Sequence, residues 1–280
     1  MRIKAYAKVN WHLAVLGRRP NGYHDLDMVM QRLDLHDDIE LEAADELQLI
    51  VQGRQLEADS NNLILRAALA LRQATGNSQG ARMTLTKRIP LGAGLGGGSA
   101  DAAATLLGLN ELWNLGLSGA QLQSIGLGIG ADVPYCLEMS PARVGGLGEQ
   151  IQTLPAFAPM WLVLLQPRAS LSTKDVFRHY DAHSVPQAAS DTQAVIRALT
   201  QGDMTALRQF ARNDLQASAA SLLPEISTLV KVLYDAGAPF AQMTGSGSVV
   251  YGAFLDYQEA LAAYEMLRQG EAYCQLCRCL

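Results

Sequence analysis

Cysteine is scarce in this sequence, and a concentration of basic charge is absent. The 280 residues include four cysteines, and three of these lie within the last seven positions. This distribution excludes the disulfide framework of a small secreted domain and favours a reducing, cytoplasmic setting. Lysine and arginine number 22 against 27 aspartate and glutamate residues, which gives a net charge of −5. Without a basic block, electrostatic binding to nucleic acid or to acidic lipid is not expected.

Long hydrophobic runs are absent as well. The longest uncharged stretch, residues 112–131, contains five glycines among polar Asn, Ser and Gln side chains, which would be costly in hydrocarbon. Near the start of the chain, Lys8, Asn10 and His12 interrupt any apolar segment of the kind that a secretion signal requires. We therefore expect a cytoplasmic globular protein that does not bind a membrane.

The composition that remains is typical of a chain with a substantial core. Hydrophobic residues make up 49% of the sequence and charged residues 18%. The length allows one large domain or two small ones, and Pro155 and Pro159 indicate a boundary. We therefore expect domains at residues 1–155 and 156–280. Helical and strand patterns follow one another without strict βαβ alternation, which predicts the α+β class.

The opening segment alternates apolar and polar residues over a dozen positions. This period predicts a strand, with Lys8, Asn10 and His12 projecting from one face. Ser60 or Asn61 is expected to cap a helix. Further strands are expected near 29–35, 39–41, 47–51, 83–86, 161–165, 241–243 and 249–254, and helices near 99–113, 172–179, 191–199, 204–212, 224–236 and 257–269.

A glycine-rich loop is the strongest local signal. Five of the seven residues from Gly92 to Gly98 are glycine, with a strand pattern before them and a helix pattern after them. Such a loop at a helix N-terminus favours a bound phosphate. A dinucleotide site would need an acidic residue at the end of a second strand about 20 residues on, but Glu111 falls within the helix. A Walker A loop would need lysine at the position of Gly98.

Five motifs together resemble one family. Pro90 to Ser99 is similar to the phosphate-binding signature of the GHMP kinases, and Ala7 to His24 is similar to the opening motif of one branch of that family. Gly130 to Pro134, Asn213 to Leu215 and Met243 to Ser248 fit further motifs in the family's order. We therefore identify the chain as resembling GHMP kinases over most of its length.

The branch-specific opening motif is matched with Asn21 in place of aspartate. Two departures from the family pattern stand out in the same region, because Trp11 replaces a usual leucine and Tyr6, just before the motif, replaces a usual proline. None of these changes removes a reacting group, although Trp11 and Tyr6 both flank the strand that carries the expected catalytic lysine.

The resemblance implies a two-domain GHMP kinase fold with the active site in the cleft between the domains. It implies transfer of the ATP γ-phosphate to the 2-hydroxyl of 4-diphosphocytidyl-2-C-methyl-D-erythritol, in the non-mevalonate route to isoprenoids, with Mg²⁺ accompanying ATP. The expected partner is this small molecule, and the expected state is a monomer or a weak homodimer. Homoserine or mevalonate kinase activity is the alternative, against which the Gly22-Tyr23-His24 turn argues.

The family's catalytic pair corresponds to Lys8 and Asp132. A tertiary alcohol is a poor nucleophile, so a carboxylate that accepts its proton helps the transfer, and a nearby lysine stabilises charge on the phosphoryl group. From the residues alone, Asp132 could instead form an Asx turn and Lys8 could be a solvated strand lysine.

Binding residues follow from the same resemblance. The ATP-binding set is Pro90, Leu91, Gly92, Ala93, Gly94, Leu95, Gly96, Gly97, Gly98, Ser99, Ala100 and Asn62, the last of which could instead be a helix cap. The substrate-binding set is Asn10, Tyr23, His24, Phe177, Thr173, Gly245 and Ser246. In the family, aromatic residues at the turn and at the Phe177 region stack on cytosine, while the turn histidine hydrogen-bonds the base.

Two other classes of function, and a metal site, are weaker interpretations. A dinucleotide-dependent oxidoreductase would bind NAD(P) without ATP hydrolysis, and a non-catalytic nucleotide-binding regulator would have lost Lys8 or Asp132, both of which are present. Cys274, Cys277 and Cys279 offer three thiols with no fourth ligand nearby, so no structural metal is expected.

Overall fold

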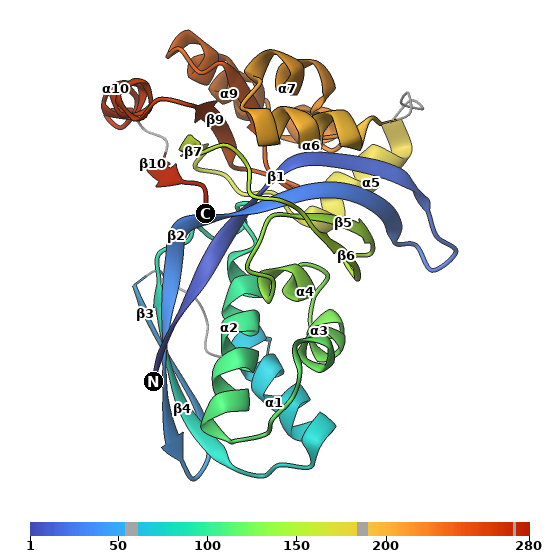
Figure 1. Cartoon of the computed structure of the whole chain (residues 1–280), viewed down its shortest axis with the longest axis vertical. Helices are drawn as coiled ribbons and strands as arrows, with labels where there is room; N and C mark the ends of the chain where they lie inside the picture. Colours follow the sequence, from blue (N-terminus) through green and yellow to red (C-terminus); the bar gives the residue numbers. More distant parts are fainter. Residues whose placement is uncertain (54–60, 184–189, 271–272) are drawn as a thin grey trace.

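The computed structural model describes residues 1–53, 61–183, 190–270 and 273–280, which form two sheets with helices packed against each (Figure 1). The first sheet contains β1 (Arg2–Arg18), β2 (His24–Ala44), β3 (Leu47–Gly53), β4 (Gly80–Lys87), β5 (Ala142–Gly146) and β6 (Gln150–Thr153). The second contains β7 (Trp161–Gln166), β8 (Phe240–Met243), β9 (Val250–Phe254) and β10 (Tyr273–Arg278).

Four of the described helices belong to the first half of the chain and six to the second. Those beside the first sheet are α1 (Leu63–Thr75), α2 (Gly97–Leu112), α3 (Gly119–Leu127) and α4 (Val133–Cys136). Those that follow are α5 (Thr173–His183), α6 (Thr192–Gln201), α7 (Met204–Phe210), α8 (Gln216–Leu222), α9 (Glu225–Asp235) and α10 (Tyr257–Leu267). The change from one sheet to the other falls between β6 and β7, in the segment that contains the two expected boundary prolines.

Both sheets are largely antiparallel. The first has the order β3-β4-β2-β5-β6 with β1 paired to β2, and the second has the order β10-β7-β9-β8. Among the described pairs, β3 with β4 is the parallel one. Helices therefore do not serve as regular crossovers between parallel strands, and the predicted α+β class is confirmed.

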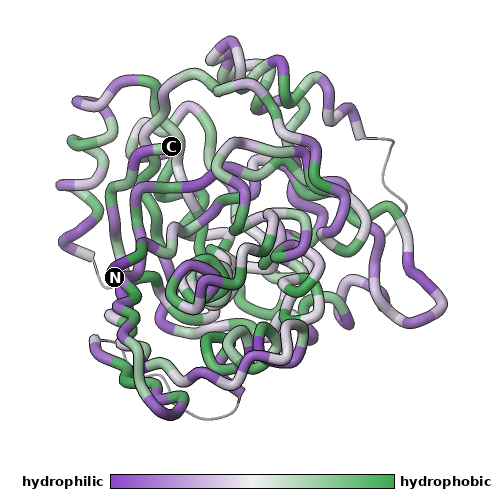
Figure 2. The backbone as a smooth tube through the Cα atoms, turned by 60° about the horizontal axis from the view of Figure 1, so that its bottom comes forward, coloured by the Kyte–Doolittle hydropathy of each residue, from purple (hydrophilic) through white to green (hydrophobic). Residues whose placement is uncertain are grey.

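Strands β1 and β2 form a long ribbon that reaches from the first sheet to the second (Figure 1). The two strand pieces expected at 29–35 and 39–41 are parts of the single strand β2. Figure 2 shows that the loop joining the ribbon strands projects from the body and is hydrophilic. The ribbon thus carries β1 residues into contact with both halves of the chain.

Irregularities in the ribbon change which face the β1 side chains occupy. A shift of register lies between Asn10 and His12, and such a bulge inserts an extra residue and reverses the alternation. Beyond it, Leu13 lines the same cavity as Lys8 and Asn10, while His12 Nε2 lies 2.5 Å from Ser190 Oγ. The prediction that His12 shares the face of Lys8 and Asn10 was therefore wrong.

Helix starts differ by a few residues from the sequence expectation. Asn62 rather than Asn61 caps α1, because its Oδ1 accepts a hydrogen bond from the Ile64 backbone N–H at 3.0 Å; Ser60 lies outside the described residues. Helix α2 begins at Gly97, two residues before the expected Ser99. The glycines at its start are helical because the preceding Gly96 makes the turn, with φ of 68°.

Helix α2 is buried against the ribbon. Its alanine-rich surface belongs to a core cluster shared with α1 and the first sheet. A Cβ atom at Gly108 would lie 2.2 Å from Leu41 Cδ1 and 2.6 Å from Ile3 Cδ1. Glycine at this position therefore allows the helix to approach the sheet closely, and it fixes where the glycine-rich loop at the helix start lies.

A second core cluster fills the space between the two sheets. Trp11 is fully buried there. Its indole packs edge-on against Tyr251 and donates a hydrogen bond to Gln31 Oε1 at 2.9 Å. The other departure from the family pattern, Tyr6, packs against His36 with Arg32 over its ring. Packing within and beside β1 thus accommodates both side chains.

Some elements were not anticipated from the sequence. Strands β5 and β6, helix α8 and the final strand β10 had no clear period-two or helical signal. Strand β10 contains Cys274 and Cys277 and pairs with β7, and Cys277 and Cys279 lie in the core between the sheets. Within the described residues, no group of three or more His, Cys, Asp or Glu side chains could hold a metal ion.

A membrane crossing is not supported by any described helix. None of the helices in the described part of the chain combines the length and the apolar character that spanning a bilayer requires.

Candidate active site

A cavity of about 480 Å³ lies where the ribbon, the glycine-rich loop and the second half of the chain meet. It is lined by Lys8, Asn10, Leu13, Leu26, Met28, Leu63, Lys87, Ala131, Asp132, Leu171, Thr173, Phe177, Leu215, Gly245, Ser246, Gly247 and residues 90–99. The structure therefore brings together most of the predicted site residues. Among the described residues, the predicted Asn62, Ala100, Tyr23 and His24 lie outside this lining.

Two glycine loops pack backbone to backbone along one side of the cavity. A Cβ at Gly94 would lie 2.2 Å from the Thr244 carbonyl oxygen, and one at Gly245 would lie 2.9 Å from the Gly94 carbonyl oxygen. Both glycines have positive φ, 73° and 56°. The backbone N–H groups of Ser248 and Val249 also donate to carbonyls of the first loop. The two loops can therefore pack this closely only because Gly94 and Gly245 have no side chains.

The N-terminus of α2 opens into the cavity. Its first residues, Gly97, Gly98 and Ser99, line the cavity, and the N-cap residue Gly96 has no side chain to occupy the first amides. The first N–H groups of a helix have no partner within the helix and lie at the positive end of its dipole. This end of the cavity is therefore suited to phosphate.

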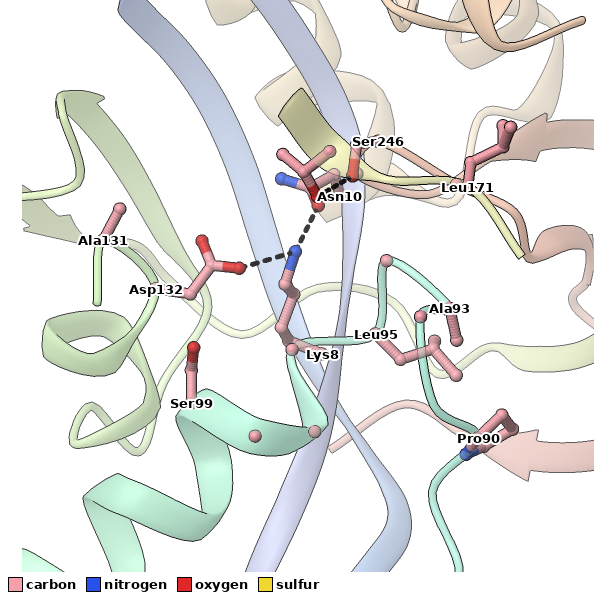
Figure 3. A pocket seen from close by; sticks show the side chains of 18 of the residues that line it. Lys8, Asn10, Pro90, Ala93, Leu95, Ser99, Ala131, Asp132, Leu171 and Ser246 are labelled. Carbon is pink, nitrogen blue, oxygen red and sulfur yellow. Dashed lines mark hydrogen bonds and ion pairs between the residues drawn. The ribbon is translucent and has the colours of Figure 1, made fainter. Parts of the chain in front are cut away.

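Lys8 and Asp132 face each other across the cavity, as Figure 3 shows. Lys8 Nζ lies 3.3 Å from Asp132 Oδ2 and donates to Asn10 Oδ1 at 2.7 Å. The Lys8 side chain is 3% exposed, whereas that of Asp132 is 31% exposed. Asp132 occupies the N-cap position of α4 but directs its carboxylate to Lys8, so the alternative of an Asx turn does not describe it. The carboxylate is accessible to a substrate while the ammonium is held in place.

The glycine-rich loop also positions the Lys8 side chain. The Lys8 backbone N–H donates to the Leu95 carbonyl at 3.0 Å. A Cβ at Gly96 would lie 2.9 Å from Lys8 Cε and 3.0 Å from its Cγ. The lysine stem therefore runs directly over Gly96, and the glycine-rich loop and strand β1 form one structural unit.

A buried charged cluster joins the two ends of the glycine-rich loop. Lys87 Nζ donates to Asp37 Oδ2 and to Asp101 Oδ2, each at 2.6 Å. Asp37 also accepts a hydrogen bond from the backbone N–H of Ile89, just before the loop, while Asp101 lies in α2 just after it. Burial raises the pKa of Asp101, against the opposing effect of Lys87. Lys87 thus ties the strand that enters the loop to the helix that leaves it.

The second half of the chain supplies the opposite side of the cavity through hydrogen bonds. Asn213 Nδ2 donates to the carbonyls of Met243 and Gly245 at 2.9 and 2.8 Å. Asp214 Oδ2 accepts from the Val15 backbone N–H at 2.8 Å. These contacts fix the second glycine loop relative to β1, which gives the N-D-L motif a positioning role.

The predicted base-binding residues are only partly brought together. The His24 and Phe177 rings stack with centroids 4.7 Å apart and an interplanar angle of 20°, and Phe177 lines the cavity. Thr173 Oγ1 lies 2.8 Å from Ser246 Oγ beside them. Tyr23, in contrast, is 65% exposed at the end of the ribbon.

Several residues that line the cavity were not predicted from the sequence. Leu26 and Met28 on β2 lie opposite Val15 and Leu13 in the ribbon, and their alternation could have been recognised once the pairing was known. Lys87 ends β4 three residues before Pro90 and resembles an exposed strand lysine. Its position just before the glycine-rich loop, where a cation could lie near a bound phosphate, was the signal that could have identified it.

Comparison with known proteins agrees with this geometry. Residues 62–138 match the GHMP kinases N terminal domain, and residues 195–272 match the GHMP kinases C terminal domain. The chain is 43% identical over 258 residues to 4-diphosphocytidyl-2-C-methyl-D-erythritol kinase of Pelotomaculum thermopropionicum. This match covers 91% of this chain and 90% of the relative. The chain belongs to the GHMP kinase family. This GHMP kinase is accordingly a small-molecule kinase.

Solved structures place the fold in the same family. A crystal structure of 4-(cytidine 5'-diphospho)-2C-methyl-D-erythritol kinase matches this GHMP kinase with a TM-score of 0.83 and 33% identity, and the match covers 99% of each chain. Homoserine kinase from Cytophaga hutchinsonii matches with a TM-score of 0.73 at 18% identity, over 100% of this chain and 94% of that one. The second likeness concerns the fold alone.

Proposed function

We propose that this GHMP kinase transfers the γ-phosphoryl group of ATP to the 2-hydroxyl of 4-diphosphocytidyl-2-C-methyl-D-erythritol. The similarity to kinases of that name supports the substrate. The observation that carries the proposal is the Lys8–Asp132 pair, which lies in one cavity with a glycine-rich helix N-terminus and Phe177. Such a reaction belongs to isoprenoid biosynthesis by the non-mevalonate route. Its location is proposed to be the cytoplasm, in keeping with four free cysteines.

Asp132 acts as the general base in this mechanism. Its carboxylate accepts the proton of the 2-hydroxyl as the hydroxyl oxygen forms a bond to the γ-phosphorus. The bond from that phosphorus to the β,γ-bridging oxygen breaks, and ADP leaves. Partial exposure of Asp132 to the cavity allows the hydroxyl to approach.

Lys8 holds the base and stabilises charge. Its ammonium lies 3.3 Å from the Asp132 carboxylate and so holds that carboxylate in place beside the cavity. The same ammonium faces the cavity and can stabilise charge on the phosphoryl group during transfer. Asn10 Oδ1 accepts one of its hydrogen bonds and so fixes its position.

The two halves of the cavity divide the substrates between them. Backbone amides of residues 96–99 would bind the ATP phosphates, and Asn62 remains a proposed contact near the adenine in addition to its role as a helix cap. Asn10, Thr173, Gly245 and Ser246 would contact the second substrate near the reacting hydroxyl. His24 and Phe177 would bind its cytosine, together with Tyr23 from the end of the ribbon.

The residues of the cavity fit a magnesium ion that arrives with ATP. Mg²⁺ retains several waters and is commonly held by one or two carboxylates together with substrate phosphates. The Ser99 hydroxyl, which lines the cavity, is the protein oxygen donor proposed for it, together with phosphate oxygens of ATP. Bound there, the ion would neutralise charge on the phosphates.

The test is an ATP-consumption assay with the purified protein on four acceptors. We expect phosphorylation of 4-diphosphocytidyl-2-C-methyl-D-erythritol and at most background rates with mevalonate, homoserine and galactose. Mass spectrometry of the product would locate the new phosphate on the 2-hydroxyl. Preferential phosphorylation of another acceptor would overturn the proposal.

A further inference from the structure

The His24 ring is held by groups from helix α5. His24 Nε2 lies 2.7 Å from Asp181 Oδ1, and Arg18 Nε lies 3.5 Å from Asp181 Oδ2. Phe177 stacks on the imidazole, and Tyr180 meets it edge-on with centroids 6.4 Å apart. His24 itself is 8% exposed. Contacts with three residues of one helix therefore fix both the plane of the ring and its rotation.

The Asp181 contact also determines where the proton of a neutral His24 lies. A carboxylate accepts hydrogen bonds and does not donate them, so Nε2 must carry the hydrogen that it donates to Asp181. In the neutral ring the other nitrogen, Nδ1, is then an acceptor. The hydrogen bond at one ring nitrogen of a histidine commonly sets the tautomer in this way.

The ring stack indicates where a base would meet Nδ1. Because the His24 and Phe177 planes differ by only 20°, a flat base lying edge to edge with the imidazole would also lie parallel to the Phe177 ring. Phe177 belongs to the lining of the cavity that contains Lys8 and Asp132. A base in this position would thus be joined to the same cavity as the reacting centre.

We propose that Asp181 is a positioning residue that makes His24 Nδ1 a hydrogen-bond acceptor and thereby selects cytosine over uracil. The inference rests on the proposed function, in which the second substrate carries cytosine. The exocyclic amine of cytosine donates a hydrogen bond to such an acceptor. Uracil has a carbonyl at the same place, so two acceptors would face each other with no proton between them.

The test compares the cytidine substrate with its uridine analogue in two matched variants. In Asp181→Asn, the side-chain amide can donate to Nε2 and so permits the opposite tautomer. We expect KM for the cytidine substrate to rise about tenfold and the cytidine-to-uridine ratio of kcat/KM to fall by about tenfold or more, with KM for ATP unchanged. Asp175→Asn is the control, because Asp175 lies on the same helix and pairs with Arg178.

A spectroscopic measurement reports the tautomer independently of activity. Nitrogen-15 NMR of the histidine side chains, with His24 assigned by comparison with His24→Gln, should show Nε2 protonated in the wild-type protein and a changed proton distribution in Asp181→Asn. Protonation at Nδ1 in the wild type, or an unchanged cytidine-to-uridine ratio in Asp181→Asn, would overturn the inference. Failure of the wild type to use the cytidine substrate at all would instead refute the proposed function.

Discussion

Asp132 has two features that a general base needs: a fixed neighbour and access to the cavity. Lys8 Nζ is 3.3 Å from its carboxylate, and about a third of the Asp132 side chain is exposed. Lys8 itself is almost fully buried and is held by Asn10. At the scale of single residues, the carboxylate of Asp132 is therefore the member of the pair that a substrate hydroxyl can reach.

Replacing Asp132 by asparagine should reduce turnover far more than binding. The amide has nearly the same shape but cannot accept the hydroxyl proton, so kcat should fall by roughly 10²–10⁴-fold. Steady-state kinetics with both substrates and a thermal unfolding curve are the required measurements. A kcat close to that of the wild type would show that Asp132 is not the base.

Phe177→Ala should weaken binding of the cytidine substrate. Stacking on a base contributes roughly 1–3 kcal/mol, which corresponds to an increase in KM of about 5- to 150-fold. KM for ATP should change little, because the glycine-rich loop lies on another side of the cavity. Phe210→Ala is a suitable control, since Phe210 packs against the core between the sheets. Equal losses for ATP and the cytidine substrate would indicate a folding defect rather than a base site.

At the scale of secondary-structure elements, the glycine-rich loop connects three parts of the site. Its backbone contacts the second glycine loop, its Gly96 lies beneath the Lys8 stem, and its two ends are joined through the Lys87 ion pairs. The loop is thus both the proposed phosphate site and the support for the Lys8 side chain.

Gly96→Ala should therefore impair catalysis through Lys8. The residue has φ of 68°, and its new Cβ would lie 2.9 Å from Lys8 Cε. We expect at least a tenfold loss of kcat and a higher KM for ATP, in addition to a backbone strain of about 1–2 kcal/mol. Gly116→Ala separates these effects, because Gly116 has φ of 66° but no heavy atom of the described residues within 4 Å of an added Cβ. If Gly96→Ala, like Gly116→Ala, lowered stability but left kcat unchanged, the contact with Lys8 would have no catalytic importance.

At the scale of the whole molecule, a polar network crosses from the ribbon to the second half of the chain. His12 Nε2 donates to Ser190 Oγ, its Nδ1 accepts from the Arg212 backbone N–H, and Thr192 donates to Asp27. Burial lowers the pKa of His12 to about 4, assisted by the nearby Arg212 and Arg143 and opposed by Asp27. The folded protein therefore holds His12 neutral.

This network should make folding stability fall as the solution becomes mildly acidic. Between the ordinary pKa of 6.5 and the folded value of about 4, the unfolded chain binds a proton at His12 that the folded chain does not. Stability is therefore lost as pH falls, by about 2 kcal/mol between pH 7 and pH 5. Urea unfolding at pH 7 and at pH 5 would measure this loss in the free energy of unfolding. His12→Gln should remove this part of the pH dependence. An identical loss in wild type and variant would assign it to other groups.

Features that depend on local backbone chemistry could be predicted from the amino-acid sequence. Five closely spaced glycines between a strand and a helix indicate a phosphate loop because no other residue tolerates that backbone so readily. Period-two alternation placed Lys8 and Asn10 on one face of β1. The ordered family motifs then identified the kind of enzyme. These inferences depend on neighbours in the sequence, so they did not require the fold.

Features that depend on residues distant in the sequence could be known only from the folded structure. A bulge in β1, set by pairing with β2, turned His12 away from Lys8 and Asn10. A lysine at the end of a strand is usually solvated. Lys87 is buried because α2 packs close to the sheet and brings Asp101 to it. The Asp181–His24 contact joins a helix of the second half to the ribbon. No local pattern records such contacts, because their free energy depends on burial and geometry that arise only when the sheets and helices pack together.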